Sequence, residues 1–277
     1  MLLRVTHETV FEYSNEIAGS TMEVRLRPMT DVRQTVRASV LEVSPRVRLF
    51  PYQDYFGNAT EFFTASTRHR RLAVVSRSVV HTMPARQATW TPELGPEAGA
   101  LCEYMQFDGP VCLHPDLGVI ARRFSDEADV ARRLSLITHW IHEDFEYRPL
   151  ATAVDSTIAD VLALRSGVCQ DFAHLMIGIC REMGLPARYV SGYIFTNRAA
   201  GVRGQDASHA WCQVHVPSDG WLGFDPTNDL VIDERYVEVA IGRDYRDAAP
   251  TKGLYRGSAS ERMTVAVHTE LEGNGPG

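Results

Sequence analysis

Lysine is nearly absent from this 277-residue chain: Lys252 is the only lysine among 28 basic residues, and the others are arginine. The 35 acidic residues outnumber the basic ones and leave a formal net charge of −7. Such a chain has no excess positive charge with which to hold nucleic acid or an anionic membrane. We therefore expect neither as a partner.

Cysteine is also scarce, and no two cysteines form a CxxC pair. The five cysteines are odd in number and widely spaced, which fits neither a disulfide framework nor a common zinc site. No run of roughly 20 apolar residues is present to cross a bilayer, and the N-terminal stretch lacks the apolar segment of a signal peptide. No DxDxDG calcium loop occurs either. We expect a bacterial, cytoplasmic protein that needs no metal and no cofactor.

The composition is that of a folded globular protein, with 44% hydrophobic and 23% charged residues. Short alternating runs rich in valine, arginine and threonine fill residues 1–83, for example at 34–43 and 71–80. Alternation with a period of two is typical of half-buried antiparallel strands. These runs predict an N-terminal antiparallel β-sandwich domain at 1–83.

A proline-rich stretch at 84–115 predicts a connector, and the pattern beyond it changes to helices followed by strands. The most apolar helix begins at Cys169 and ends before Gly184, so it should run through the middle of a core. Strands are predicted at 187–196, 209–216 and 221–225. We therefore expect an α+β core at 116–270, with a central helix packed on an antiparallel sheet, and a disordered tail at 271–277.

Cys169 lies where a glycine-containing loop meets the first turn of the central helix. A helix N-terminus favours a thiolate by about 0.3–2 kcal/mol, which alone is too little for a reactive cysteine. An imidazolium beside the sulfur would supply the rest, and a carboxylate behind the imidazole would orient it. His209, at the start of one predicted strand, and Asp225, at the end of the next, are the candidates.

The two strands impose a condition on this arrangement. Directly opposed residues of an antiparallel pair point to the same face of the sheet. A four-residue connection at 217–220 would place Asp225 opposite Cys212, on the wrong face. A connection of three or five residues, or a bulge, would place Asp225 opposite Trp211 and diagonal to His209. We predict one of the latter.

These residues resemble a known family. The stretches SGVCQDFAHL, GLPARYVSGY, SHAWCQVHVP, GWLGFDPTND and GRDYRDAAPTKG, together with the N-terminal β-region, are similar to bacterial transglutaminase-like proteins, often described as cysteine proteases. The resemblance covers most of the chain outside the connector and tail. It implies a papain-like core with Cys169 as nucleophile, His209 as general base and acid, and Asp225 as the orienting carboxylate.

The implied chemistry is acyl transfer on an amide bond of a peptide or protein through a thioester. Water as the second substrate makes a peptidase or amidase and an amine makes a transglutaminase; we rank hydrolysis ahead. Tyr147, Gln170 and Trp211 are candidates for the oxyanion or substrate site, and Trp211 is equally well explained as sheet packing. The alternative function is a catalytically inactive binding or scaffold protein of the same fold.

Overall fold

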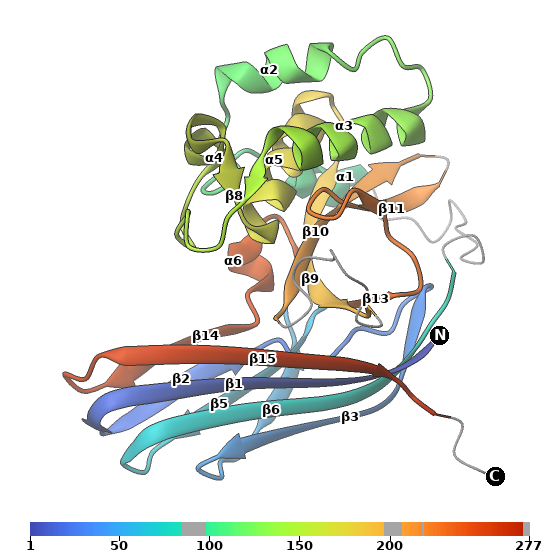
Figure 1. The fold of residues 1–277 in the computed structure, drawn as a ribbon. Coiled ribbons are helices and arrows are strands. Elements are labelled where there is room, and N and C mark those ends of the chain that lie inside the picture. The colour runs from blue at the N-terminus through green and yellow to red at the C-terminus, as the bar shows by residue number, and fades with distance from the viewer. Residues whose placement is uncertain (85–97, 197–206, 218, 274–277) are drawn as a thin grey trace.

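The computed structural model describes residues 1–84, 98–196, 207–217 and 219–273. Two layers of antiparallel strands form one half of the molecule, and helices packed on a third sheet form the other half (Figure 1). The mixed α+β class predicted from the sequence is confirmed. Most of the predicted connector, residues 85–97, lies outside the described part, and the rest of it contains α1 (Ala98–Leu101) and a 3₁₀ turn at Cys102–Met105.

The β-sandwich consists of two four-stranded sheets, with the orders β15-β1-β6-β3 and β14-β2-β5-β4. Its strands are β1 (Leu2–Ile17), β2 (Gly19–Val24), β3 (Gln34–Ser44), β4 (Phe50–Gln53), β5 (Ala59–Ala65), β6 (His69–Thr82), β14 (Thr251–Arg256) and β15 (Glu261–Leu271). Apolar side chains between the sheets, among them Phe11, Leu72 and Phe63, form its core. Burial of these alternating residues stabilises the sandwich.

The end of the chain corrects the predicted domain boundaries. Strand β15 pairs along β1, and β14 pairs along β2, so residues 251–271 complete the sandwich instead of the core (Figure 1). The predicted disordered tail is wrong at its start, since Leu271 ends β15 and the Glu272 backbone N–H donates to Leu2 O at 2.9 Å; residues 274–277 lie outside the described residues. Local alternation indicates a strand but does not say which distant strand it pairs with.

The core is a five-stranded sheet, ordered β12-β11-β10-β9-β13, with helices packed on it. Its elements are α2 (Pro115–Arg122), α3 (Val130–Asp144), β7 (Glu146–Tyr147), α4 (Ile158–Leu164), β8 (Ser166–Gly167), α5 (Cys169–Glu182), β9 (Ala187–Ile194), β10 (His209–Val216), β11 (Gly220–Asp225), β12 (Leu230–Val231), β13 (Tyr236–Gly242) and α6 (Tyr245–Ala248). Helix α5 is buried along most of its length between α2, α3, α4 and one face of β10, as its apolar sequence predicted.

The sandwich and the core share an apolar interface. Leu3, Val5 and Val80 of the sandwich pack with Tyr193, Val237 and Val239 of the core sheet. Two amide side chains also form hydrogen bonds with backbone N–H and C=O groups of β13. Gln34 bonds both the N–H and the C=O of Glu238, at 2.9 and 2.7 Å, and Asn58 bonds those of Ile241, at 2.8 Å each. Each side chain thereby takes the place of a neighbouring strand at the sheet edge.

Candidate active site

Cys169 is the first residue of α5 and is half-buried. The loop before it is held by Asp171, whose Oδ2 accepts hydrogen bonds from the Val168 N–H at 2.8 Å and the Thr152 hydroxyl at 2.6 Å. A Cβ on Gly167 would lie 2.8 Å from the Asp171 Cβ, so only glycine fits this turn. Hydrogen bonds to Asp171 and its close packing against Gly167 therefore fix the backbone just before Cys169.

The register of β10 and β11 satisfies the predicted condition. Val216 pairs with Gly220, which leaves a three-residue connection at 217–219, and Cys212 pairs with Phe224. Continued by one residue, this register places Asp225 opposite Trp211 and on the same face as His209. His209 Nε2 and Asp225 Oδ2 lie 2.7 Å apart, with both side chains completely buried.

Asp225 accepts hydrogen bonds at both carboxylate oxygens. Oδ2 accepts from His209, from Asn228 Nδ2 at 2.8 Å and from the Tyr236 hydroxyl at 2.8 Å. Oδ1 accepts from the backbone N–H groups of Thr227 at 2.9 Å and Asn228 at 3.3 Å. Burial raises the pKa of this carboxyl, but His209 and the hydrogen-bond donors outweigh it and lower the pKa below its ordinary value. Asp225 is therefore a carboxylate at neutral pH.

The same contacts favour the charged form of His209. Burial lowers the pKa of the imidazole, while the charge and hydrogen bond of Asp225, followed by the Cys169 thiol, raise it to about 10. Since Asp225 engages Nε2, Nδ1 is the ring nitrogen left for the thiol. Nδ1 is buried and forms no completed hydrogen bond within the described residues, a geometry common in the resting state of enzymes. His209 and Asp225 thus form a buried pair, and Cys169 lies near enough to the ring to contribute to its raised pKa.

Comparisons with known proteins show the family to which the chain belongs. Residues 119–226 match the model of the transglutaminase-like superfamily, and residues 3–81 match the bacterial transglutaminase-like N-terminal region. An uncharacterized protein of Mycobacterium leprae is 36% identical over 273 residues, covering 96% of this chain and 97% of the relative. The chain belongs to the bacterial transglutaminase-like family.

Two other proteins are similar to this chain over different lengths. A solved structure of a candidate cysteine protease from Cytophaga hutchinsonii covers 100% of this chain and 92% of its own, with a TM-score of 0.78 and 24% identity, and so shows the same fold. A protein-glutamine gamma-glutamyltransferase of Pseudomonas aeruginosa is 35% identical over 134 residues, which is 44% of this chain and 20% of that protein.

The three further candidates from the sequence lie in different surroundings. Tyr147 is half-buried on β7, with its ring edge-on to Phe172 of α5 at 6.4 Å. Gln170, next to Cys169, donates from Nε2 to Val154 O at 2.8 Å. Trp211 is fully buried in an apolar cluster with Val190 and Tyr236. Trp211 is therefore sheet packing beside His209 and does not line a groove open to substrate.

Asn228 and Tyr236 contact Asp225 and were not among the predicted site residues. Asn228 stands within the DPTND motif, three residues after Asp225, in the turn that begins where the Thr227 N–H donates to Asp225 Oδ1. Tyr236 begins β13, whose sequence carries no sign that it lies across the sheet from Asp225. The GRDY motif forms a structural ion-pair network, in which Arg243 pairs with Asp247 at 2.8 Å and Arg246 with Asp244 at 2.8 Å.

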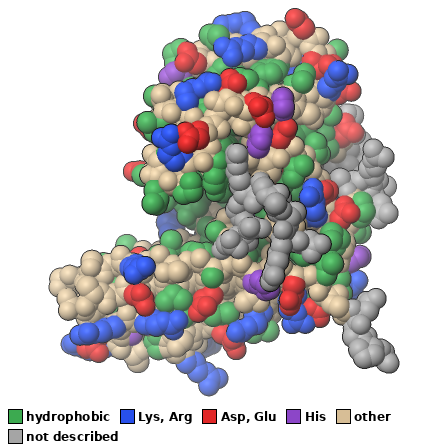
Figure 2. Space-filling model, viewed as in Figure 1, with side chains coloured by type: hydrophobic (Ala, Val, Ile, Leu, Met, Phe, Trp, Pro, Cys, Tyr) green, Lys and Arg blue, Asp and Glu red, His purple; other side chains and the backbone are tan. Residues whose placement is uncertain are grey.

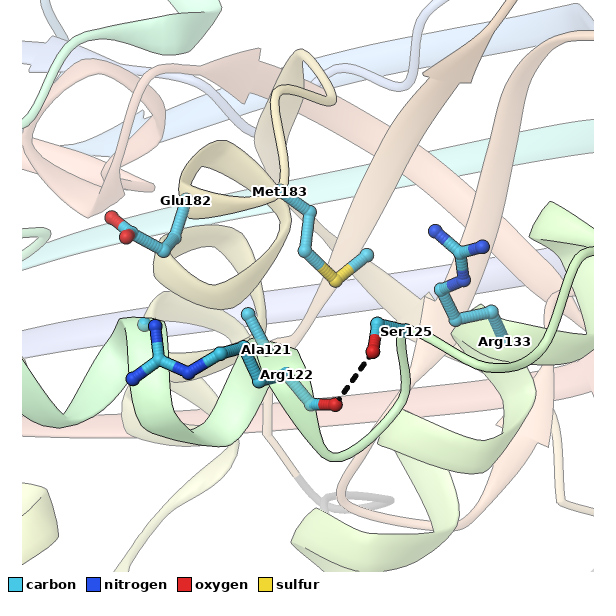
Figure 3. Close-up of a pocket in the computed structure, with 7 residues that line it drawn as sticks. Ala121, Arg122, Ser125, Arg133, Glu182 and Met183 are labelled. Carbon is cyan, nitrogen blue, oxygen red and sulfur yellow. Dashed lines mark hydrogen bonds between the residues drawn. The ribbon is translucent and has the colours of Figure 1, made fainter.

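A cavity of about 290 Å³ lies elsewhere, between α2, the start of α3 and the end of α5 (Figure 3). Its lining residues are Gly118, Ala121, Arg122, Ser125, Arg133, Glu182 and Met183. Glu182 is the last residue of α5 and Cys169 the first, so the length of this 14-residue helix, about 20 Å at 1.5 Å per residue, separates the cavity from the thiol. The cavity is not part of the candidate active site.

Within the described ranges, no cluster of three or more histidine, cysteine or acidic side chains could hold a metal ion. No described helix combines the length and apolar character needed to span a bilayer. Charges of both signs are interspersed over the face in Figure 2.

Proposed function

We propose that this protein is a cysteine-dependent enzyme that transfers acyl groups from amide bonds of peptides or proteins through Cys169, His209 and Asp225. The observation that carries the proposal is the placement of His209, with Nε2 bound to Asp225 at 2.7 Å and Nδ1 left for Cys169 at the start of α5. The similarity to a gamma-glutamyltransferase and the fold of a candidate cysteine protease support the same chemistry.

The reaction has two halves. The Cys169 sulfur attacks the amide carbonyl, the C–N bond breaks, and the imidazolium of His209 gives its proton to the leaving amine, which leaves a thioester. A second nucleophile then attacks the thioester, gives a proton to His209 and releases the thiolate. Asp225 holds the ring in orientation and stabilises its positive charge in both halves.

The developing oxyanion needs hydrogen-bond donors. The backbone N–H of Cys169, in the first turn of α5, has no carbonyl partner within the helix and is one candidate. Tyr147 remains the preferred side-chain candidate because it packs on α5 near its start. Gln170 is the weaker one, since its amide is engaged by the Val154 carbonyl.

The first test is selective alkylation. Iodoacetamide at neutral pH should label Cys169 faster than the other four cysteines, as read by mass spectrometry of tryptic peptides. Cys102 is exposed whereas Cys169 is half-buried, so accessibility alone would give the opposite order. Labelling in order of exposure would instead indicate an inactive scaffold.

The second test separates hydrolysis from transamidation. Glutamine-containing and other peptides are offered with and without a primary amine, and acid release is compared with amine incorporation. We rank hydrolysis ahead. Cys169→Ala should reduce either activity to background, while Cys112→Ala, a matched control at another half-buried cysteine, should leave it unchanged. Activity that survives Cys169→Ala would remove this mechanism.

A further inference from the structure

We propose that Tyr236 is a positioning residue of this active site, which fixes the orientation of the Asp225 carboxylate and, through it, of the His209 ring. This inference rests on the proposed function, because it assigns to Tyr236 a part in the reactivity of Cys169. Tyr236 touches neither the thiol nor a reacting atom and acts through Asp225.

The contact is direct and buried. Tyr236 is the first residue of β13, is 2% exposed, and donates from its hydroxyl to Asp225 Oδ2 at 2.8 Å. Burial and the neighbouring carboxylate raise the pKa of Tyr236 far above its ordinary value. The hydroxyl therefore stays protonated, and remains a donor, at neutral pH.

The hydroxyl is one of three donors around a single oxygen. His209 Nε2 at 2.7 Å and Asn228 Nδ2 at 2.8 Å are the other two side-chain donors to Oδ2. Three donors leave this oxygen little freedom to rotate, because any swing of the carboxylate breaks at least one charge-assisted bond in a buried site. The Tyr236 ring lies edge-on to Trp211 at 5.3 Å and 6.4 Å from the His209 ring, so it also restricts the space beside the imidazole.

The strand that carries Tyr236 is itself held from outside the core. Gln34 bonds both backbone groups of Glu238, and Asn58 bonds both backbone groups of Ile241. Both amides come from the N-terminal half of the chain. The β-sandwich thus holds one edge of β13, whose other edge pairs with β9, and the first residue of this strand is Tyr236, which donates to Asp225.

The chain offers a matched control for the removal of this hydroxyl. Tyr193 on the neighbouring strand β9 is also 2% exposed, and its hydroxyl bonds a buried histidine nitrogen, His7 Nδ1, at 3.0 Å. Tyr193 and Tyr236 differ in that the partner of Tyr193 lies in the β-sandwich. Tyr236→Phe and Tyr193→Phe therefore each remove one hydroxyl from an equally buried tyrosine. Only the hydroxyl of Tyr236 is bonded to Asp225.

Three readouts are measured on both variants and on the unaltered protein. They are the alkylation rate of Cys169 against pH, kcat and KM on the best amide substrate, and the exchange rate of the His209 ring N–H proton that faces Asp225, observed by NMR. Thermal unfolding reports any general loss of stability. The NMR readout needs neither turnover nor a reactive thiol, so it tests Tyr236 even if the proposed function fails.

We expect Tyr236→Phe to lower both the alkylation rate and kcat about tenfold or more with KM nearly unchanged, as for loss of a bond to a charged group. The acid limb of the pH profile should move to higher pH, because Asp225 loses a donor that keeps its pKa low. The His209 ring proton should exchange faster. Tyr193→Phe should lower the melting temperature without any of these changes.

Two results would overturn the inference. The first is that Tyr236→Phe leaves the alkylation rate of Cys169, the acid limb of its pH profile and the exchange of the His209 ring proton unchanged. The other is an equal effect of Tyr193→Phe, which would show general loosening. If Cys169 of the unaltered protein is not selectively alkylated, the proposed function fails, and unchanged ring-proton exchange in Tyr236→Phe would then separately reject the positioning role.

Discussion

Two buried polar networks lie on the same face of β10, separated by Trp211. The first joins His209 to Asp225 at 2.7 Å. In the second, Gln213 accepts from Arg188 Nε at 2.8 Å and donates to Glu238 Oε1 at 2.6 Å. Residues 209, 211 and 213 share this face because side chains alternate along a strand. His209, Asp225, Gln213 and Glu238 are all buried, yet they belong to two different kinds of network.

The networks differ in how they end. The amide of Gln213 is engaged on both its oxygen and its nitrogen, so that network is closed on protein groups. The His209 network ends at Nδ1, which forms no hydrogen bond within the described residues. Cys169 lies near enough to this ring to raise its pKa. A closed network stabilises a fold, whereas an open end beside a nucleophile can move a proton.

Burial raises the pKa of both buried carboxyls, yet their net pKa shifts have opposite directions. Burial raises the pKa of Glu238, and the nearby Asp31 adds to this, so the pKa lies above its ordinary value despite Arg33, Arg188 and Gln213. The pKa of Asp225 is lowered despite complete burial, because the charge of His209 and then the hydrogen-bond donors around the carboxylate outweigh the effect of burial. The charges and donors around each buried acid therefore set the direction of its pKa shift.

The largest expected effect comes from removing the charge of the first network. Asp225→Asn should leave the fold intact and lower the alkylation rate and turnover of Cys169 by about 10²–10⁴-fold, because a neutral amide neither stabilises the imidazolium nor fixes its tautomer. Stopped-flow alkylation and peptide turnover measure it. A loss smaller than tenfold would mean that Asp225 does not orient His209.

A smaller effect should appear in the pH dependence of stability. The pKa of His209 is raised to about 10. The folded state therefore binds this proton more tightly than the unfolded state. The stabilisation is complete below the ordinary pKa of about 6.5 and is lost as the pH rises towards 10.

Urea unfolding at pH 6, 8 and 10 measures this dependence. The difference in unfolding free energy between the unaltered protein and His209→Gln should become smaller as the pH rises. A difference that is constant across this range would show that the imidazole is not held in its charged form.

The smallest effect on reactivity should come from the second network. Gln213→Leu leaves Arg188 and Glu238 without their amide partner and should cost about 1–3 kcal/mol of unfolding free energy, with the alkylation rate of Cys169 unchanged. Urea unfolding and alkylation of the same sample test both parts. Slower alkylation of the folded variant would show that the two networks are coupled through Trp211.

Much of this site could be predicted from the order of residues. The central helix and Cys169 at its start follow from a continuous apolar segment preceded by a glycine turn and ended by Gly184. The partners His209 and Asp225 follow from residue type together with the alternation rule, which required a connection of three or five residues or a bulge. A three-residue connection is found at 217–219. Helical periodicity and the alternation of side chains along a strand depend on neighbouring residues, so both can be read from the sequence.

Long-range pairing could not be predicted in this way. The sequence pattern predicts residues 251–270 as part of the core, whereas β14 and β15 complete the sandwich. Trp211, for which a substrate site and sheet packing are equally good predictions, has a fully buried indole. Neither result can be derived from a local pattern, because burial depends on which distant strands cover a face.

The linear order alone specifies the reactive groups, the elements that carry them and the face on which His209 and Asp225 lie. Tertiary structure decides the rest: that Tyr236 of the fifth strand donates to Asp225, and that Gln34 and Asn58 of the sandwich hold that strand. The reason is that alternation along a strand is set by neighbouring residues, while contacts across sheets depend on how separately formed surfaces pack together.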